Sequence, residues 1–286
     1  MISFLRYRVL CGAVSILFIL AGVVAYFQND GFRYSVDFTG GTQVRLKTNN
    51  PYGSEVVKNA LAKAGFSNAV IREFGPQELA VRVQEFSNDA RGLSQKIKDS
   101  FEQNIEGAQV EITEINAIGA GVGDMLRWNS LLGLILCFLL MMGYIAFRFW
   151  SISFGVGAVV ALMHDVLAIL AFFAITQREI SPNVVSAILA TLGYSINDTI
   201  VIFSRIRENF AKLRGQSEDH IVDVSINQTL RRTLLTSLST ALVVVSLVVF
   251  GGESLRNLSV TLLFGIIVGT YSSIYMASPV MLLLRR

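Results

Sequence analysis

Residues 130–149 read SLLGLILCFLLMMGYIAFRF and residues 152–175 read ISFGVGAVVALMHDVLAILAFFAI, with only two residues between the runs. A helix that spans a bilayer needs about 20 predominantly apolar residues. Each run is long enough, so the pair predicts two membrane helices joined by a very tight connection. Four other windows meet the same requirement. The six predicted spans are about 9–27, 130–149, 152–175, 183–204, 233–250 and 258–283.

The composition of the chain agrees with a membrane protein. Of its 286 residues, 52% are hydrophobic and only 16% are charged, and the mean hydropathy is +0.54. Soluble domains carry about 25% charged residues. This composition excludes a disordered chain, and the absence of short-period repeats excludes the fibrous classes.

Residues 28–129, between the first two spans, differ from the rest of the chain. They carry 11 lysines and arginines and 13 acids, which predicts a folded aqueous domain. Apolar spacing predicts the element order βαββαβ. The predicted elements are a strand at 41–47, a helix at 54–64 capped by Ser54, strands at 69–74 and 78–83 around a Gly75-Pro76 turn, a helix at 90–103 and a strand at 108–113. We therefore expect an α+β ferredoxin-like domain with two helices on one face of an antiparallel sheet, which by itself names no function.

The distribution of basic residues predicts the orientation, because lysine and arginine are enriched in cytoplasmic loops. Eleven of them lie near the N-terminus, at Arg148, in the 205–232 segment and at the C-terminus, whereas the other short loops hold only Arg178 and Arg256. Both termini are therefore predicted to be cytoplasmic. The chain divides into a cytoplasmic N-terminus with the first span (1–27), an external domain (28–129), and five further spans (130–286) with a main cytoplasmic loop at 205–232.

The first span has a second interpretation, as a cleaved signal peptide. Arg6 and Arg8 precede it, and Val23-Val24-Ala25 resembles a cleavage site. Its apolar core exceeds the roughly 7–15 residues of a signal peptide, which favours a retained anchor. Cleavage would leave five spans.

Common enzyme signatures are missing from the sequence. Cys11 and Cys137 both fall in apolar runs, which supports neither a disulfide framework nor a cysteine-ligated metal site. No Gly-Lys-Ser/Thr phosphate-binding loop is present, so no ATP site of that type is predicted. Gly193-Tyr-Ser195-Ile-Asn197 lacks the final glycine of a hydrolase nucleophile elbow and lies inside a span. We therefore expect neither an enzyme nor a resident cofactor or metal.

Ionisable residues inside the apolar windows are the candidate functional residues, because a charge near the bilayer centre costs at least about 2.5–3.5 kcal/mol. An acid and a base at similar depth on neighbouring spans can neutralise each other. The candidates are His164 and Asp165 near the middle of the third span, Asn197 and Asp198 in the fourth, and Arg231 and Arg232 at the start of the fifth.

Two interpretations of these residues remain open. In the first, Asp198 exchanges a proton and Arg232 senses the change, so that the helix interface has two arrangements of similar free energy. In the second, the two residues form a static pair that joins two helices. For Asp165 the static interpretation has more weight, because His164 or polar groups on neighbouring spans can satisfy its carboxylate. Arg205 and Arg207 lie near an interface and are interpreted as snorkelling residues.

Glycines recur at positions that suggest close packing or flexibility. Gly265 and Gly269 have the spacing that lets membrane helices approach closely. Gly119, Gly121 and Gly123 do not match a dinucleotide-binding motif, because Asp124 occupies its last glycine position. They are interpreted as loosening the link between the external domain and the second span.

The run from Gly193 to Phe210, GYSINDTIVIFSRIRENF, closely resembles the fourth span and following loop of SecF members of the SecD/SecF family of protein-export membrane proteins. Three further stretches resemble the same family and cover the chain in order. They are Val36-Asp37-Phe38-Thr39-Gly40-Gly41-Thr42, His164-Asp165, and Asn227-Gln228-Thr229-Leu230-Arg231-Arg232-Thr233. The chain departs from the family pattern at Ala120, where proline is frequent between Gly119 and Gly123.

The resemblance implies a role that the residues alone do not give. It implies six spans that form half of a bundle of the resistance-nodulation-division type, with SecD supplying the other half. It further implies an auxiliary subunit of the Sec translocase in a bacterial inner membrane, where the proton-motive force promotes late steps of preprotein export. The implied partners are SecD, the SecYEG channel, the translocating preprotein, YajC and, indirectly, SecA, with no nucleic acid. The proton is the implied coupling ion, with Asp198 at the position of the family's proton carrier and Arg232 at that of its fifth-span arginine.

Two rival functions stay open. Half of a small-molecule efflux pump of the same superfamily predicts an apolar cleft in the external domain. A passive scaffold predicts that Asp198 and Arg232 tolerate change as well as neighbouring lipid-facing residues do.

Overall fold

The computed structural model describes residues 2–66, 69–75, 77–83 and 89–285. The chain forms two compact units, one made by the chain up to Arg33 together with the chain from Leu132 onward, and the other by Tyr34–Leu131. The sequence-based boundary of the external domain, 28–129, lies a few residues away at each end. Pro76 of the predicted turn lies outside the described residues.

The membrane unit contains helices that are long and apolar enough to cross a bilayer. Within the described part of the chain there are six such helical segments, which confirms the predicted number. Their elements are η1 (Leu5–Tyr7) with α1 (Arg8–Gln28), α5 (Ala120–Phe149), α6 (Ile152–Thr176), α7 (Pro182–Lys212), α8 (Glu218–Phe250), and α9 (Gly252–Ser272) continued by the π-helix η2 (Ser273–Ala277) and α10 (Ser278–Arg285). Two short strands, β1 (Arg33–Tyr34) and β6 (Glu179–Ile180), flank the first and third spans.

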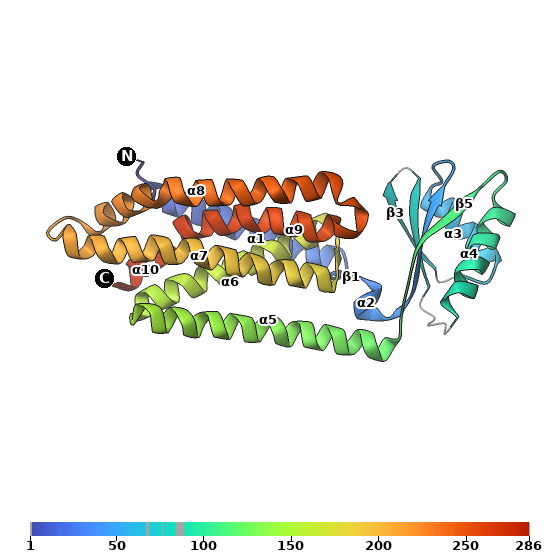
Figure 1. Cartoon of the computed structure of the whole chain (residues 1–286), viewed down its shortest axis with the longest axis horizontal. Coiled ribbons are helices and arrows are strands. Elements are labelled where there is room, and N and C mark those ends of the chain that lie inside the picture. Colours follow the sequence, from blue (N-terminus) through green and yellow to red (C-terminus); the bar gives the residue numbers. More distant parts are fainter. Residues whose placement is uncertain (1, 67–68, 76, 84–88, 286) are drawn as a thin grey trace. The chain divides into compact units, whose positions relative to one another are not determined.

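Three of the spans form the centre of the membrane unit. About half of the apolar window is buried in α6, α7 and the α9–α10 segment (56%, 56% and 50%), compared with 6% in α5, 11% in α1 and 17% in α8. Figure 1 shows α7, α8 and α9 running side by side, and α9 packs against α6, α7 and α8. The buried polar residues of these helices, such as Asp165 and Asp198, are therefore surrounded by protein and not by lipid.

Most of the segment 205–232, predicted as a cytoplasmic loop, is helix. α7 continues to Lys212 and α8 already begins at Glu218. Glu208 accepts hydrogen bonds from Arg205 and Lys212, spacings that stabilise a helix surface, and Ser217 accepts a bond from the His220 N–H as an N-cap. A search for apolar windows misses these helix extensions because they carry many charged and polar residues.

The N-terminal segment is held by α8. The backbone N–H of Leu5 donates to the buried carboxylate of Asp223 at 3.0 Å. The Asn227 side chain accepts a hydrogen bond from the N–H of Ile2 at 2.9 Å and donates one to the carbonyl of Ile2 at 2.7 Å. The side chains of α8 therefore hold the backbone of Ile2, and Asp223 satisfies the Leu5 N–H, a group that the start of a helix leaves without a partner.

The second unit has the predicted element order βαββαβ. Its elements are α2 (Val36–Thr39), β2 (Gly41–Thr48), α3 (Ser54–Lys63), β3 (Val70–Gly75), β4 (Glu78–Val83), α4 (Ala90–Asn104) and β5 (Val110–Ile118). The strand order is β3-β4-β2-β5, and all pairs are antiparallel. α3 and α4 cover one face of the sheet (Figure 1). This order confirms the ferredoxin-like prediction.

The core of this unit lies between the sheet and its two helices. Alternate residues of β2 and β4 meet one face of each helix, and the fully buried side chains include Val44, Val81, Leu61, Ile97 and Phe101. The predicted cap of α3 is wrong. Gly53 occupies the N-cap position, and the carboxylate of Glu73 on β3 accepts the N–H of Ser54 at 2.7 Å. A residue distant in sequence thus replaces the local cap.

Candidate functional site

Asp165 is completely buried in the centre of α6 and bonds to two side chains. Its Oδ2 atom accepts a hydrogen bond from Ser195 Oγ on α7 at 2.5 Å, and its Oδ1 atom lies 3.2 Å from His164 Nδ1. Polar side chains inside a membrane protein bond across helices because lipid offers them no partner. The carboxylate therefore joins α6 to α7.

Asp198 lies one helical turn beyond Ser195 on α7 and is only 3% exposed. Its Oδ2 atom is buried and, among the described residues, has no hydrogen-bond partner. Two side chains on α8 lie near this carboxyl, the Ser237 hydroxyl and the Arg232 guanidinium. Within the described part of the chain the two charged groups form no ion pair, and Arg232 is exposed. The structure thus places Arg232 near Asp198 without a direct contact.

The other predicted residues are arranged differently. Asn197 is exposed on α7, and Arg231 is exposed on α8. His164 is nearly buried and its ring faces Tyr271 of α9, with 6.1 Å between ring centroids. The Tyr271 hydroxyl donates a hydrogen bond to the Cys11 carbonyl at 2.7 Å and accepts one from the Ser15 hydroxyl at 3.1 Å. His164 and Asp165 therefore belong to a polar cluster that reaches α1, α7 and α9.

Sequence reasoning missed Ser195, Ser237 and Tyr271. Ser195 was considered only as a hydrolase nucleophile and rejected, yet it is the hydrogen-bond donor to Asp165. Its position one turn before Asp198 is a signal that points to the same helix face. Ser237 also bonds to Thr270 of α9 at 2.7 Å, which links α8 to α9 beside the carboxyl.

Two glycines of α9 make the close contact of α9 with α7 possible. A Cβ atom on Gly265 would overlap the side chain of Thr191, and one on Gly269 would lie 2.9 Å from Ser195 Cβ. The predicted small-residue spacing therefore acts at the same helix pair that carries Ser195 and Asp198. The Gly265–Gly269 spacing lets α9 pack directly against α7 at Thr191 and Ser195.

The predicted glycine motif lies in the other unit, where α2 turns into β2. Gly40 and Gly41 have φ values of +70° and +111°, which side chains rarely adopt. The N–H of Gly40 ends α2 by bonding to the Val36 carbonyl at 2.8 Å, and Asp37 accepts the Ser35 hydroxyl at 2.8 Å. These residues have a structural role in the turn.

The second set of predicted glycines lies where α5 begins. The carbonyl of Gly119 accepts the N–H of Gly123 at 3.0 Å in the first turn of α5. A Cβ atom on Gly123 would lie 2.9 Å from the backbone nitrogen of Gly40. Gly123 therefore has a packing role beside the loosening role expected from the sequence, because it lets α5 approach the glycine motif.

Replacing Gly40 with alanine is expected to destabilise the second unit by about 1–3 kcal/mol, because φ +70° with ψ 172° is a region that only glycine occupies readily. The measurement is trypsin cleavage within 34–131 of the full chain as urea is raised. Gly53→Ala is the matched control, since Gly53 has φ −69° and open space around it. Equal urea midpoints for the two variants would contradict the strained-turn interpretation.

Comparison with known proteins decides the family. The profile of "Protein export membrane protein SecD/SecF, C-terminal" matches residues 96–286, and that of the "SecD/SecF GG Motif" matches residues 29–51. The chain belongs to the SecD/SecF family. The second match contains Asp37, Gly40 and Gly41, so the turn described above is the family's GG motif.

Relatives of this family match almost the whole chain. Proteins named "Protein translocase subunit SecF" are 38% identical in Vibrio alginolyticus, 36% in Thermodesulfovibrio yellowstonii and 36% in Escherichia coli O157:H7. The alignments cover 98%, 99% and 98% of this chain and 89%, 94% and 87% of the relatives. With its six apolar helices, this SecD/SecF family member is therefore a bacterial multi-pass membrane protein with a transport role.

Solved structures agree with the fold. SecDF from Thermus thermophilus, described as a translocon-associated membrane protein, superimposes with a TM-score of 0.89 at 32% identity over 99% of this chain. A SecDF structure in a super-membrane-facing form gives a TM-score of 0.70 over the same share. The present chain spans 38% of the length of each of those chains. The likeness supports the predicted half-bundle of the resistance-nodulation-division type.

Proposed function

We propose that this chain is the SecF-type subunit of a Sec translocase and that, with SecD, it uses the proton-motive force to promote late steps of preprotein export through SecYEG. Its relatives carry the name of that subunit, and the solved SecDF chain is long enough to hold a second, SecD-like part. SecA, acting from the cytoplasm, and YajC are the further partners in this proposal. The coupling ion is a proton, and no cofactor takes part.

The observation that carries the proposal is the environment of Asp198. Burial penalises the charged form of its carboxyl, because a charge in a membrane helix costs at least about 2.5–3.5 kcal/mol. The nearby Arg232 guanidinium favours the charged form. These opposing influences suit a group that gains and loses a proton during a cycle, whereas a static pair would be served better by direct contact.

Buried polar atoms on α7 and α8 support a route for the proton. Tyr194 Oη, Thr191 Oγ1 and Thr233 Oγ1 are buried and, like Asp198 Oδ2, lack partners among the described residues. Buried polar groups are usually satisfied by protein or by ordered water. Water beside these groups would connect Asp198 to solvent by short proton transfers.

The helix contacts give protonation a way to alter packing. Ser195, one turn from Asp198, joins α7 to α6 through Asp165, and it touches α9 at Gly269. Movement of one charge through a potential of about 100 mV supplies about 2.3 kcal/mol. That amount is comparable to the free energy of a few hydrogen bonds, so it suits repeated small rearrangements of the α6–α7–α9 contact.

The proposal includes an orientation. Both termini face the cytoplasm, and the ferredoxin-like unit lies outside the bacterial inner membrane, where it is available to a preprotein that leaves the channel. The bias of basic residues supports this placement.

Replacing Arg232 with leucine is expected to remove most of the proton-dependent stimulation of export, because Asp198 then loses the attraction that favours its charged form. Arg232→Lys should retain a larger share since it keeps the charge. The measurement is preprotein translocation by inverted membrane vesicles with and without a proton-motive force.

The matched control is Arg214→Leu, which removes an exposed arginine between α7 and α8. Equal stimulation in the Arg232→Leu and Arg214→Leu vesicles would favour the passive scaffold. Normal export together with a drug-susceptibility phenotype would favour the efflux pump.

A further inference from the structure

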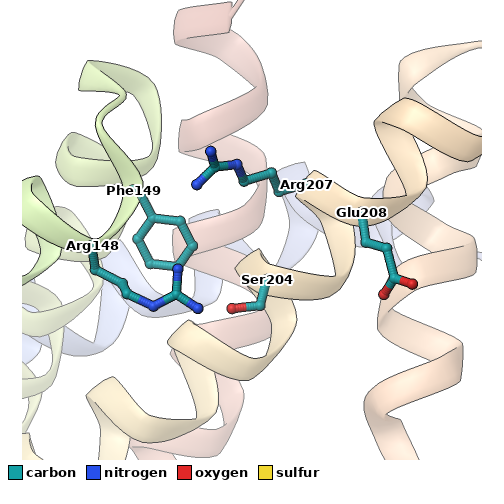
Figure 2. Close-up of a pocket in the computed structure, with 5 residues that line it drawn as sticks. All are labelled: Arg148, Phe149, Ser204, Arg207 and Glu208. Atoms are coloured by element: carbon teal, nitrogen blue, oxygen red, sulfur yellow. The ribbon is translucent and has the colours of Figure 1, made fainter.

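A pocket of about 370 Å³ lies where the end of α5 meets α7, about two to three helical turns after Asp198. It is lined by Arg148, Phe149, Ser204, Arg207 and Glu208 (Figure 2). We propose that this pocket binds the headgroup phosphate of an anionic phospholipid that lacks an ammonium group, such as phosphatidylglycerol or cardiolipin.

The pocket holds two positive charges that are available to a ligand. Among the described residues, neither Arg148 nor Arg207 forms an ion pair with an acid. The one acid among the lining residues, Glu208, is already bound by Arg205 at 2.6 Å and by Lys212 at 2.5 Å, and Figure 2 shows its carboxylate turned away from the two arginines. The free charge of the pocket is therefore positive.

The arginines are arranged around a rigid aromatic side chain. Phe149 is buried and stacks on Phe154 with ring planes 6° apart, while its edge contacts Phe203. The guanidinium carbon of Arg148 lies 5.4 Å from the centre of the Phe149 ring. In Figure 2 the guanidinium groups of Arg148 and Arg207 lie on either side of that ring, and the Ser204 hydroxyl points toward Arg148.

This set of donors matches a phosphate group. Guanidinium groups donate paired hydrogen bonds to phosphate oxygens, and a hydroxyl adds one more donor. A phosphatidylethanolamine headgroup would bring an ammonium group into the same space, and Glu208, the acid that would receive it, is already held by two cations. The charge balance therefore favours an anionic headgroup over a zwitterionic one.

The surroundings of the pocket indicate a lipid as the source of the phosphate. Phe147, Trp150 and Ile152, at the turn between α5 and α6, are 72%, 81% and 84% exposed, as expected of residues in contact with a membrane interface. A second, mostly apolar cavity of about 660 Å³ runs along α5 and α6 from Trp150 to Leu139. This apolar cavity begins at the turn that also carries Arg148, so an acyl chain has a place beside the headgroup site.

The test is a titration of the purified full chain in neutral detergent with fluorescent short-chain phosphatidylglycerol and, separately, phosphatidylethanolamine. We expect tighter binding of phosphatidylglycerol, with about fivefold weaker binding in Arg148→Gln and in Arg207→Gln, since one basic residue at a membrane surface contributes about 1 kcal/mol. Arg214→Gln, which removes an exposed arginine outside the pocket, should bind as the wild type does. Inorganic phosphate should not displace the lipid at equal concentration.

Two further variants separate binding from folding. Arg207→Lys keeps the charge and should lose less affinity than Arg207→Gln, whereas Gly143→Leu fills the apolar cavity, where open space surrounds Gly143, and should weaken lipid binding without a change in charge. Equal affinity of the wild type and both glutamine variants would overturn the proposal. So would equal binding of the two lipids, or displacement by inorganic phosphate at equal concentration, which would indicate a site for a soluble anion.

Discussion

Asp198→Asn is expected to abolish the stimulation of preprotein export by the proton-motive force. Asparagine has nearly the shape of aspartate and still forms hydrogen bonds, so it can occupy the space on α7 where Asp198 is 3% exposed. Asparagine does not ionise, however, so this position can no longer take up or release a proton in response to burial and to Arg232. Export driven by ATP alone should continue, and the variant should insert and bind its partner subunit normally.

The measurement combines preprotein translocation by inverted vesicles with proton flux in the same vesicles. Asp219→Asn is the matched control, because it makes the same chemical change at a partly exposed position in the first turn of α8, where Asp219 lies 3.5 Å from Arg8. Full stimulation of export by the proton-motive force in the Asp198→Asn vesicles would contradict the proton-coupling proposal. Loss of stimulation in both variants would show that the effect does not depend on burial of the carboxyl.

Gly265→Leu is expected to have the largest effect on stability. The first side-chain carbon at this position already overlaps Thr191, and leucine adds three more carbons between α7 and α9. Overpacking of a tight core costs about 1–3 kcal/mol, and we expect about 3 kcal/mol because both helices belong to the buried centre of the membrane unit. Thermal unfolding of the purified chain in detergent measures the loss.

Gly133→Leu serves as the control, since open space surrounds Gly133 on the poorly buried helix α5. Gly269→Ala is a milder variant that presses directly on Ser195, and it should weaken the Ser195–Asp165 hydrogen bond with a smaller loss of stability. Equal unfolding temperatures for Gly265→Leu and Gly133→Leu would show that α7 and α9 do not depend on the close approach.

Elements with a repeating apolar pattern could be predicted from the sequence. The run 152–175 has a length and composition that only a membrane helix satisfies, and α6 forms at Ile152–Thr176. The strands at 41–47 and 78–83 could be predicted because alternate residues, such as Val44 and Val81, meet a buried core. The close approach at Gly265 and Gly269 could also be predicted, because the spacing of the two glycines is visible within one short stretch of sequence.

Features that depend on distant residues could not be predicted. The cap of α3 comes from Glu73 rather than from Ser54, and nothing near residue 54 indicates this. The polar ends of α7 and α8 were assigned to a loop, because apolar windows do not register helices that are stabilised by pairs such as Glu208 with Lys212.

The candidate site shows the same division. Asp165 and Asp198 are conspicuous because charge is rare in apolar windows. Ser195, which bonds to Asp165, and Ser237, which lies near Asp198, are small polar residues of a type that is common in the spans, so only the folded structure distinguishes them from the others. The distance between Asp198 and Arg232 likewise depends on how α7 and α8 face each other.

The attachment of the N-terminal segment to α8 has a consequence for synthesis. Ile2 bonds to Asn227, a residue 225 positions later in the chain, and Leu5 bonds to Asp223, 218 positions later. At translation rates of about 5–20 residues per second, that interval lasts about 10–45 s. The segment before α1 must therefore wait, without these hydrogen-bond partners, until the first part of α8 has been synthesised.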